Sequence, residues 1–296
     1  MSRALVLGGG GPVGIAWEAG LLAGLAEGGV DLAQADYTLG TSAGSVVGAL
    51  VAMGRPAGDI AAPIIAEADR PRDIPSQVAE ERPGAPNMMI LLQKMQEAAS
   101  GERDPQVVRR EIGEFSLAAQ TVDEEAFLSG FGRQLAQAGE GVWPGRGYAC
   151  TAVDTASGEF VVWDAGSKVN LSRAVASSCS VPGVFPAITI NGRRYMDGGM
   201  RSATNADLAK GHDRTVVIAV RLAAGEFGDR MMAPVKREID VLEGAGGKAH
   251  LITPDEASTA AFGMNLMNPR HRPAAARAGL DQGRALAASL RGFWGA

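Results

Sequence analysis

Two glycine-rich turns constrain what this chain can fold into more than any other feature of its sequence. The first, Gly8–Gly11, follows an apolar strand pattern at Ala4–Leu7 and precedes a helical pattern that begins near Gly14. The second, Gly40–Gly44, follows a short strand pattern at Tyr37–Leu39 and leads directly into a helix of small residues. A repeated order of strand, sharp turn and helix is typical of α/β proteins with a parallel sheet.

Strand patterns return in the second half of the chain, where Asn191-Gly192 predicts a tight hairpin turn because both residues tolerate a positive φ. Between about residues 55 and 144, prolines separate helical segments and no strand pattern is convincing. We therefore expect one domain over residues 1–296: a three-layer α/β/α fold with a mainly parallel central sheet and a helical insertion at 55–144. Further strands are predicted at Tyr148–Val153, Phe160–Trp163, Ile188–Ile190, Arg194–Met196, Val216–Val220 and His250–Thr253, and further helices at Ser45–Met53, Ser172–Ser178 and Ala274–Leu290.

Charge and apolar patterning exclude several classes of function. The net charge is -5 and no basic run could neutralise a row of phosphates, so nucleic acid is not expected as a partner. The apolar run Ala4–Leu7 is too short for a secretory apolar region and leads straight into glycines, and no stretch reaches the ~20 consecutive apolar residues of a membrane span. We expect a soluble, cytoplasmic protein, for which contact with a membrane surface stays open.

Two cysteines, Cys150 and Cys179, lie in a strand pattern and at a helix end, without the spacing of a zinc site or a redox pair. They are predicted to be buried free thiols, which fits a reducing compartment. We expect neither a metal nor another cofactor.

The second glycine turn fits a nucleophile elbow. In Gly40-x-Ser42-x-Gly44 the flanking glycines allow a strained turn that lifts the serine hydroxyl clear of the sheet, next to a helix N-terminus. In a chain with 40 glycines the motif alone is weak. A tight turn capped by Ser42 or Ser45 explains it equally well.

The first glycine turn can hold an oxyanion. Backbone N–H groups of Gly9, Gly10 and Gly11 can converge on an anion at the start of a helix, whose dipole favours negative charge. A rival interpretation is a dinucleotide fingerprint, because Gly9-x-Gly11-x-x-Gly14 matches G-x-G-x-x-G. That interpretation needs an acidic residue at the end of the second strand, where this chain has the serine turn, so nucleotide binding ranks well behind.

A serine nucleophile needs a base. The chain has three histidines, His212, His250 and His271, and none lies in a glycine-rich or motif-like setting. Asp197-Gly198-Gly199 offers a carboxylate at the end of a hairpin strand, with glycines behind it that leave room for a serine hydroxyl. An Asp-Gly turn alone is ordinary.

These three motifs, in this order, resemble those of the patatin-like phospholipases, lipid acyl hydrolases that use a Ser-Asp dyad. The resemblance covers Leu5–Leu25, Leu39–Met53 and Ala176–Gly199, whereas the helical segment 55–144 and the C-terminal third match no motif, so roughly half of the chain is covered. It implies that Ser42 attacks an ester carbonyl, that Asp197 accepts its proton and later activates water, and that N–H groups around Gly10 and Gly11 stabilise the oxyanion. The resemblance thus implies a lipid or acyl-ester substrate.

One position departs from the family pattern. Where members usually carry Arg or Lys before the last glycine of the loop, this chain has Val13. Loss of a cation at the mouth of the site would shift preference toward neutral esters or lipids. Alternatively, the family's cation is structural and Val13 replaces it with apolar contacts.

An apolar helical face in the insertion is a candidate substrate-side surface. Met88, Met89 and Leu92 lie on it together with Leu91 and Met95. A helix packed in the core is the favoured interpretation, and a mobile lid over the acyl pocket is the alternative. For the whole chain, the alternative to an enzyme is a catalytically silent lipid- or acyl-binding protein on the same fold.

Overall fold

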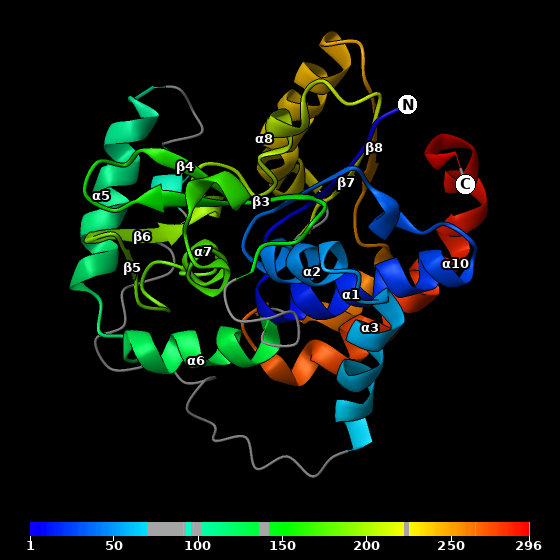
Figure 1. The fold of residues 1–296 in the computed structure, drawn as a ribbon, viewed down its shortest axis with the longest axis horizontal. Helices are drawn as coiled ribbons and strands as arrows, with labels where there is room; N and C mark the ends of the chain where they lie inside the picture. The colour runs from blue at the N-terminus through cyan, green and yellow to red at the C-terminus, as the bar shows by residue number, and fades with distance from the viewer. Residues whose placement is uncertain are drawn as a thin grey trace.

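The computed structural model describes residues 1–69, 91, 93–95, 97, 102–135, 142–221, 225–263 and 265–295. Within these ranges the strands form one sheet with the order β5-β6-β3-β2-β1-β7-β8, and β4 pairs with β3 (Figure 1). Strands β3, β2, β1, β7 and β8 are parallel, whereas β4, β5 and β6 run antiparallel to their neighbours. The strand bounds are β1 Arg3–Leu7, β2 Tyr37–Gly40, β3 Gly147–Asp154, β4 Phe160–Asp164, β5 Ile188–Ile190, β6 Arg193–Asp197, β7 Arg214–Ile218 and β8 Lys248–Ile252.

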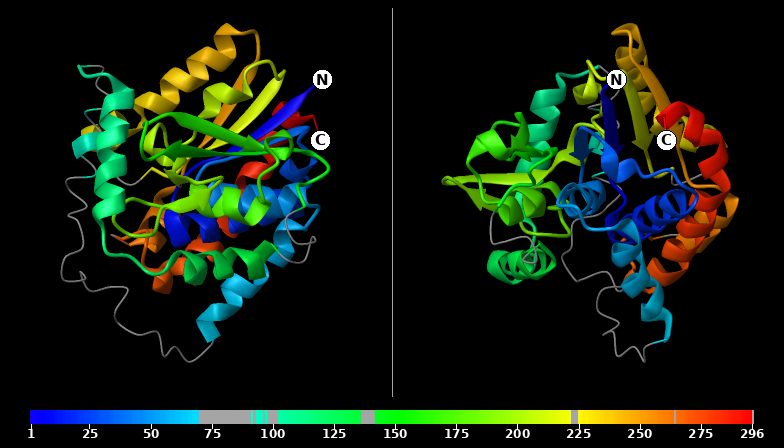
Figure 2. Two further views of the ribbon diagram at one scale, coloured as in Figure 1. Left: turned by 60° about the vertical axis from the view of Figure 1, so that its left-hand side comes forward. Right: turned by 45° about the vertical axis from the view of Figure 1, so that its right-hand side comes forward.

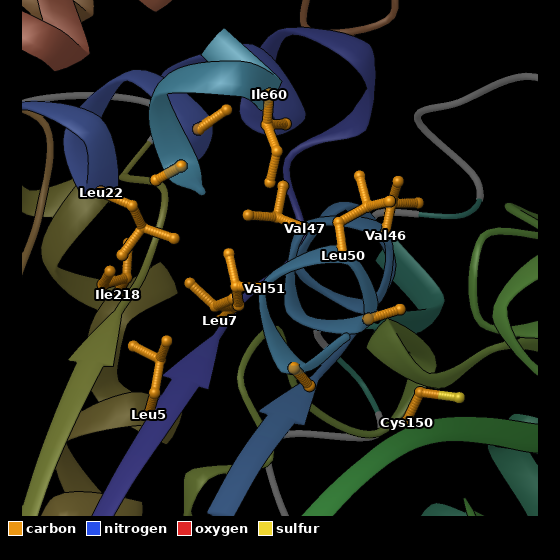
Figure 3. Close-up of a cluster of buried hydrophobic side chains, with 14 of the residues drawn as sticks. Leu5, Leu7, Leu22, Val46, Val47, Leu50, Val51, Ile60, Cys150 and Ile218 are labelled. Carbon is orange, nitrogen blue, oxygen red and sulfur yellow. The ribbon is translucent and has the colours of Figure 1, made fainter. Parts of the chain in front are cut away.

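Helices cover both faces of the sheet. The first strand shows why: Leu5 and Leu7 point into a core with α1 and α2, whereas Ala4 and Val6 point into a second core with α8, as alternation along a strand requires. Figure 3 shows Leu5, Leu7 and the β7 residue Ile218 facing the apolar side of α2. The helix bounds are α1 Gly11–Glu27, α2 Ala43–Ala52, α3 Ala57–Ile65, α5 Pro105–Ala118, α6 Glu124–Leu135, α7 Leu171–Ser178, α8 Gly225–Gly244, α9 Glu256–Phe262 and α10 Arg272–Trp294.

The three-layer fold with a mainly parallel sheet is therefore confirmed, and the strands predicted from the sequence are present with ends shifted by at most two residues. Asn191 and Gly192 both have positive φ, as the hairpin prediction requires. The described part of 55–144 contains helices and loops without a strand. Helix α8 was not predicted, because Gly225, Gly228 and an internal Pro234 obscure its helical pattern.

The outer edge of strand β5 is covered by side chains from two helices, which hydrogen-bond to its backbone. The Glu124 carboxylate at the start of α6 accepts hydrogen bonds from the Thr189 N–H at 2.7 Å and the Thr189 hydroxyl at 2.9 Å. Arg173 of α7 donates to the Thr189 carbonyl oxygen at 3.1 Å and also pairs with Glu124. Helices α6 and α7 are thereby held beside the edge, away from the two termini, which lie near each other in all three views (Figures 1 and 2).

None of the helices in the described ranges is both long enough and apolar enough to cross a membrane. The two cysteines, Cys150 and Cys179, are free and buried, as predicted.

Candidate active site

Ser42 occupies a strained turn between β2 and α2. Its φ of 53° and ψ of -117° are unusual for a residue with a side chain, and the surrounding contacts hold it there. Its N–H donates to the Ser178 hydroxyl at 2.9 Å, and its carbonyl oxygen accepts from the Ser45 hydroxyl at 2.6 Å. The side chain is placed at the N-terminus of α2, the geometry of a nucleophile elbow.

The glycines on either side of Ser42 are required by close backbone contacts. A Cβ atom on Gly40 would lie 2.4 Å from the Cα of Ser45, and one on Gly44 would lie 2.2 Å from the carbonyl oxygen of Leu7. The Gly44 N–H donates to the Gly8 carbonyl oxygen at 2.9 Å. The elbow is therefore locked against the end of β1, where the glycine loop begins.

The glycine loop passes directly beside Ser42. A Cβ atom on Gly9 would lie 3.4 Å from the Cβ of Ser42 and 4.0 Å from its hydroxyl oxygen. The Gly9 N–H is already used, because it donates to the Ala203 carbonyl oxygen at 2.8 Å. Among the described residues the N–H groups of Gly10 and Gly11 have no hydrogen-bond acceptor, and neither does that of Ala43, which sequence analysis did not single out. Gly14 uses its own N–H to bond the Gly10 carbonyl oxygen at 2.7 Å.

Asp197 ends strand β6 and is 2% exposed. One carboxylate oxygen, Oδ1, accepts the Gly199 N–H at 2.7 Å. The other, Oδ2, is buried and has no hydrogen bond of regular geometry to a described residue. Burial raises the pKa of Asp197 to about 7, although interactions with the Ser42 hydroxyl and the Gly199 N–H oppose the rise. The Ser42 hydroxyl is thus near enough to the Asp197 carboxyl to lower its pKa, although no hydrogen bond of regular geometry joins the two side chains.

Gly198 lets the Asp197 turn approach strand β3. A Cβ atom on Gly198 would lie 2.1 Å from the Thr151 hydroxyl oxygen. Because Asp197 pairs with Ala152 of β3, this close approach fixes the position of the Asp197 carboxylate relative to the end of β3.

An apolar cavity of about 100 Å³ opens beside Ser42. Aromatic rings form much of one wall: Phe127 stacks on Phe185 with ring centroids 4.6 Å apart and meets Phe131 edge to face at 5.0 Å. Phe127 and Phe131 could not be recognised as site residues from the sequence, because α6 lies in the stretch without a recognisable motif. The full lining is Gly11, Pro12, Ile15, Ser42, Ala43, Phe127, Phe131, Cys179, Val181, Phe185 and Met267.

The predicted substrate-side residues are placed elsewhere or cannot be located. Val13 has no exposed surface, packs in the main core and is absent from the cavity lining. The structure therefore supports the packing interpretation of this position over the electrostatic one. Met88, Met89 and Leu92 lie outside the described residues. Their neighbour Leu91 is buried in a separate core cluster with helix α5 and strands β3 and β6.

A second buried acid, Glu18 of α1, lies outside the cavity lining. Both carboxylate oxygens lack a hydrogen-bond partner among the described residues, and burial raises the pKa of Glu18 well above its ordinary value.

The histidines make contacts of a structural kind. His212 stacks on Tyr37 with ring centroids 5.3 Å apart, and His250 meets Phe293 at 5.4 Å. The ring of His271 lies against Gly263. None of these rings lines the cavity beside Ser42.

In this three-layer α/β fold, a strained serine follows β2 and lies beside a glycine loop and a buried carboxyl. This arrangement is typical of serine hydrolases. The family model of the patatin-like phospholipases matches residues 5–210, and the chain belongs to this family of lipid acyl hydrolases.

Solved structures with a similar fold were also found, whereas no curated protein matches the sequence. VipD from Legionella pneumophila is 17% identical, with 97% of this chain and 67% of that chain covered and a TM-score of 0.48. The type III effector protein ExoU is 14% identical, with 97% of this chain and 53% of that chain covered and a TM-score of 0.41. This chain thus spans about half the length of ExoU. Both TM-scores are below 0.5, so the two likenesses carry no weight for the function.

Proposed function

We propose that the protein is a serine acyl hydrolase that cleaves carboxylic esters of lipids or small acyl compounds through a Ser42-Asp197 dyad. The observation that carries the proposal is the buried carboxyl of Asp197, whose pKa is raised to about 7 and which interacts with the hydroxyl of a serine held on a strained elbow. A carboxylate with a pKa near neutrality is a far better base than one at its ordinary value.

The proposed reaction has two halves. Ser42 Oγ attacks the ester carbonyl carbon while its proton passes to Asp197, and the leaving alcohol takes that proton as the tetrahedral intermediate collapses to an acyl-serine. Water then attacks the acyl-serine, its proton passes through Asp197, and Ser42 is released with its hydroxyl restored. No co-reactant other than water is needed.

The oxyanion is stabilised by backbone donors. The N–H groups of Gly10 and Gly11 lie at the N-terminus of α1 without an acceptor among the described residues, and that of Ala43 follows the nucleophile. Such preorganised donors are worth about 3 kcal/mol each in other hydrolases. Gly9 contributes by its lack of a side chain next to Ser42 rather than by its N–H, which bonds Ala203.

The direct test is covalent labelling with a fluorophosphonate. We expect stoichiometric modification of the wild type at Ser42, read by mass spectrometry of the peptide that contains it, and no labelling of Ser42→Ala. Ser289→Ala, which replaces an exposed serine of α10 and removes no contact to Ser42, is the matched control and should still label. An unlabelled wild type that binds fatty acid would instead favour the silent binding protein.

The aromatic cavity is proposed to receive the acyl chain, since it opens beside Ser42 and is lined by apolar groups. Phe131→Ala should enlarge it and raise the ratio of kcat/KM for octanoate over butyrate esters about tenfold, because each buried methylene is worth on the order of 1 kcal/mol. The matched control is Phe115→Ala, in the separate cluster around α5, which should leave the ratio unchanged. An unchanged ratio in Phe131→Ala would place the acyl chain elsewhere.

A further inference from the structure

The two members of the proposed dyad are carried by strands that do not neighbour each other. Ser42 follows β2 and Asp197 ends β6, and β3 lies between these strands in the sheet. Adjacent strands are ~4.8 Å apart, so two strand spacings separate the backbones of β2 and β6 by about 10 Å. Backbone pairing in the sheet therefore does not fix the distance between the Ser42 and Asp197 side chains. That distance depends on the turns that follow β2 and β6.

A buried amide joins these two turns. Asn205 has no exposed surface and is held in the left-handed region with φ 52°. Its Nδ2 group donates to the hydroxyl oxygen of Thr41, the residue before the nucleophile, at 3.0 Å. The same group donates to the Ser202 carbonyl oxygen at 2.9 Å and lies 3.4 Å from the carbonyl oxygen of Gly198, the residue after Asp197.

Neighbouring groups fix the orientation of this amide. Arg201 donates from Nη1 to Asn205 Oδ1 at 2.8 Å and is itself held by two hydrogen bonds to the Asp207 carboxylate. Because a guanidinium only donates, Oδ1 must face Arg201 and Nδ2 must face Thr41. The Thr41 hydroxyl also lies 2.9 Å from that of Thr151 on the intervening strand β3.

We propose that Asn205 is a positioning residue that aligns Ser42 and Asp197 across strand β3. This inference rests on the proposed function, because alignment matters for turnover only if the two residues act together. Asn205 acts through Thr41 on one side and through the turn at Gly198 and Ser202 on the other. It has no contact with the cavity that would receive the acyl group.

The test replaces the donor group and preserves the shape. Asn205→Asp should lower kcat by about 30- to 100-fold, with KM changed less than about threefold, because a misplacement of about 1 Å costs that much in rate. Asn191→Asp is the matched control: Asn191 is also left-handed, with φ 51°, but lies in the exposed hairpin turn. It should keep the wild-type kcat.

Two variants of Thr41 guard against a folding artefact. Thr41→Ser keeps the acceptor hydroxyl and should retain activity, whereas Thr41→Val removes it and should reproduce the kcat loss of Asn205→Asp. The double variant should be no worse than about threefold below the poorer single one, because both changes break one connection. A melting temperature lowered in Asn205→Asp with kcat intact would overturn the proposal and leave Asn205 a merely structural residue.

A crystallographic readout separates this inference from the proposed function. The distance between Ser42 Oγ and the nearer Asp197 carboxylate oxygen should increase by about 1 Å in Asn205→Asp relative to wild type, whether or not the protein turns over an ester. An unchanged distance would overturn the positioning role. Absence of ester hydrolysis by the wild type would count against the proposed function alone.

Discussion

Replacing Ser42 by alanine or Asp197 by asparagine should lower kcat for ester hydrolysis at least about 1,000-fold, because each change removes one half of a unit that acts together. The double variant should be no more than a few-fold worse than either single variant. Initial rates with a chromogenic p-nitrophenyl ester, measured on variants whose folding is checked by circular dichroism, provide the comparison. Residual rates above that of water should persist, because the oxyanion donors remain.

The control for loss of a buried acid is Asp154→Asn, since Asp154 is 1% exposed and ends β3, where its carboxylate accepts hydrogen bonds from the Ala156 and Ser157 N–H groups of the following turn. It should change kcat less than about threefold per folded molecule. Single alanine variants of His212, His250 and His271 should likewise stay active. Additive losses in the Ser42 and Asp197 pair, or a histidine variant as inactive as Ser42→Ala, would contradict the dyad.

The pH dependence of kcat/KM should show a single acidic limb with an apparent pKa near 7. Burial raises the pKa of Asp197 to about 7, and the base works only when ionised. Activity is therefore present above this pKa and lost below it, by about tenfold per pH unit, so that about a hundredfold is lost by pH 5. Rates with an uncharged ester between pH 5 and 9 measure the limb.

Stability should follow pH in the opposite direction. A carboxyl whose pKa is raised on folding contributes stability at pH values below its unfolded value near 3.8, and this stability is lost as the pH rises to about 7. Asp197→Asn should therefore melt at a higher temperature than wild type at pH 8 while being inactive. The raised pKa of Glu18 likewise lowers stability as the pH rises, but Glu18 does not line the cavity. Glu18→Gln should therefore leave the acidic limb of activity in place. A limb near pH 4 would mean that a carboxyl at its ordinary pKa is the base.

Much of the fold could be predicted from the sequence because its signals are local. A continuous apolar run at Ala4–Leu7 marked β1, and Asn191-Gly192 marked the hairpin between β5 and β6. The glycine turns were recognisable because only glycine permits the contacts made at Gly44 and Gly198. Helix α8 was hidden by residues that disfavour helices, and tertiary contacts overrode that local preference.

The parts of the site that the sequence did not reveal depend on contacts between distant segments. Phe127 stacks on Phe185 in the cavity wall although the two residues are 58 positions apart in the sequence, and nothing near either residue predicts the other. The Gly9 N–H is taken by Ala203, a pairing that no local pattern encodes. Val13 shows the same limitation, because a motif position specifies neither the depth of a side chain nor its neighbours.

The closure of edge strand β5 bears on how copies of this protein behave in a crowded solution. An exposed edge presents unpaired N–H and C=O groups that can recruit a strand from another chain. Here the outward N–H and carbonyl of Thr189 are already occupied by Glu124 and Arg173. Self-association by strand addition at this end would first have to break a charged pair and detach α6, the helix that carries Phe127 and Phe131. The contacts that keep the sheet from growing are thus the same ones that hold the helix carrying part of the wall of the cavity beside Ser42.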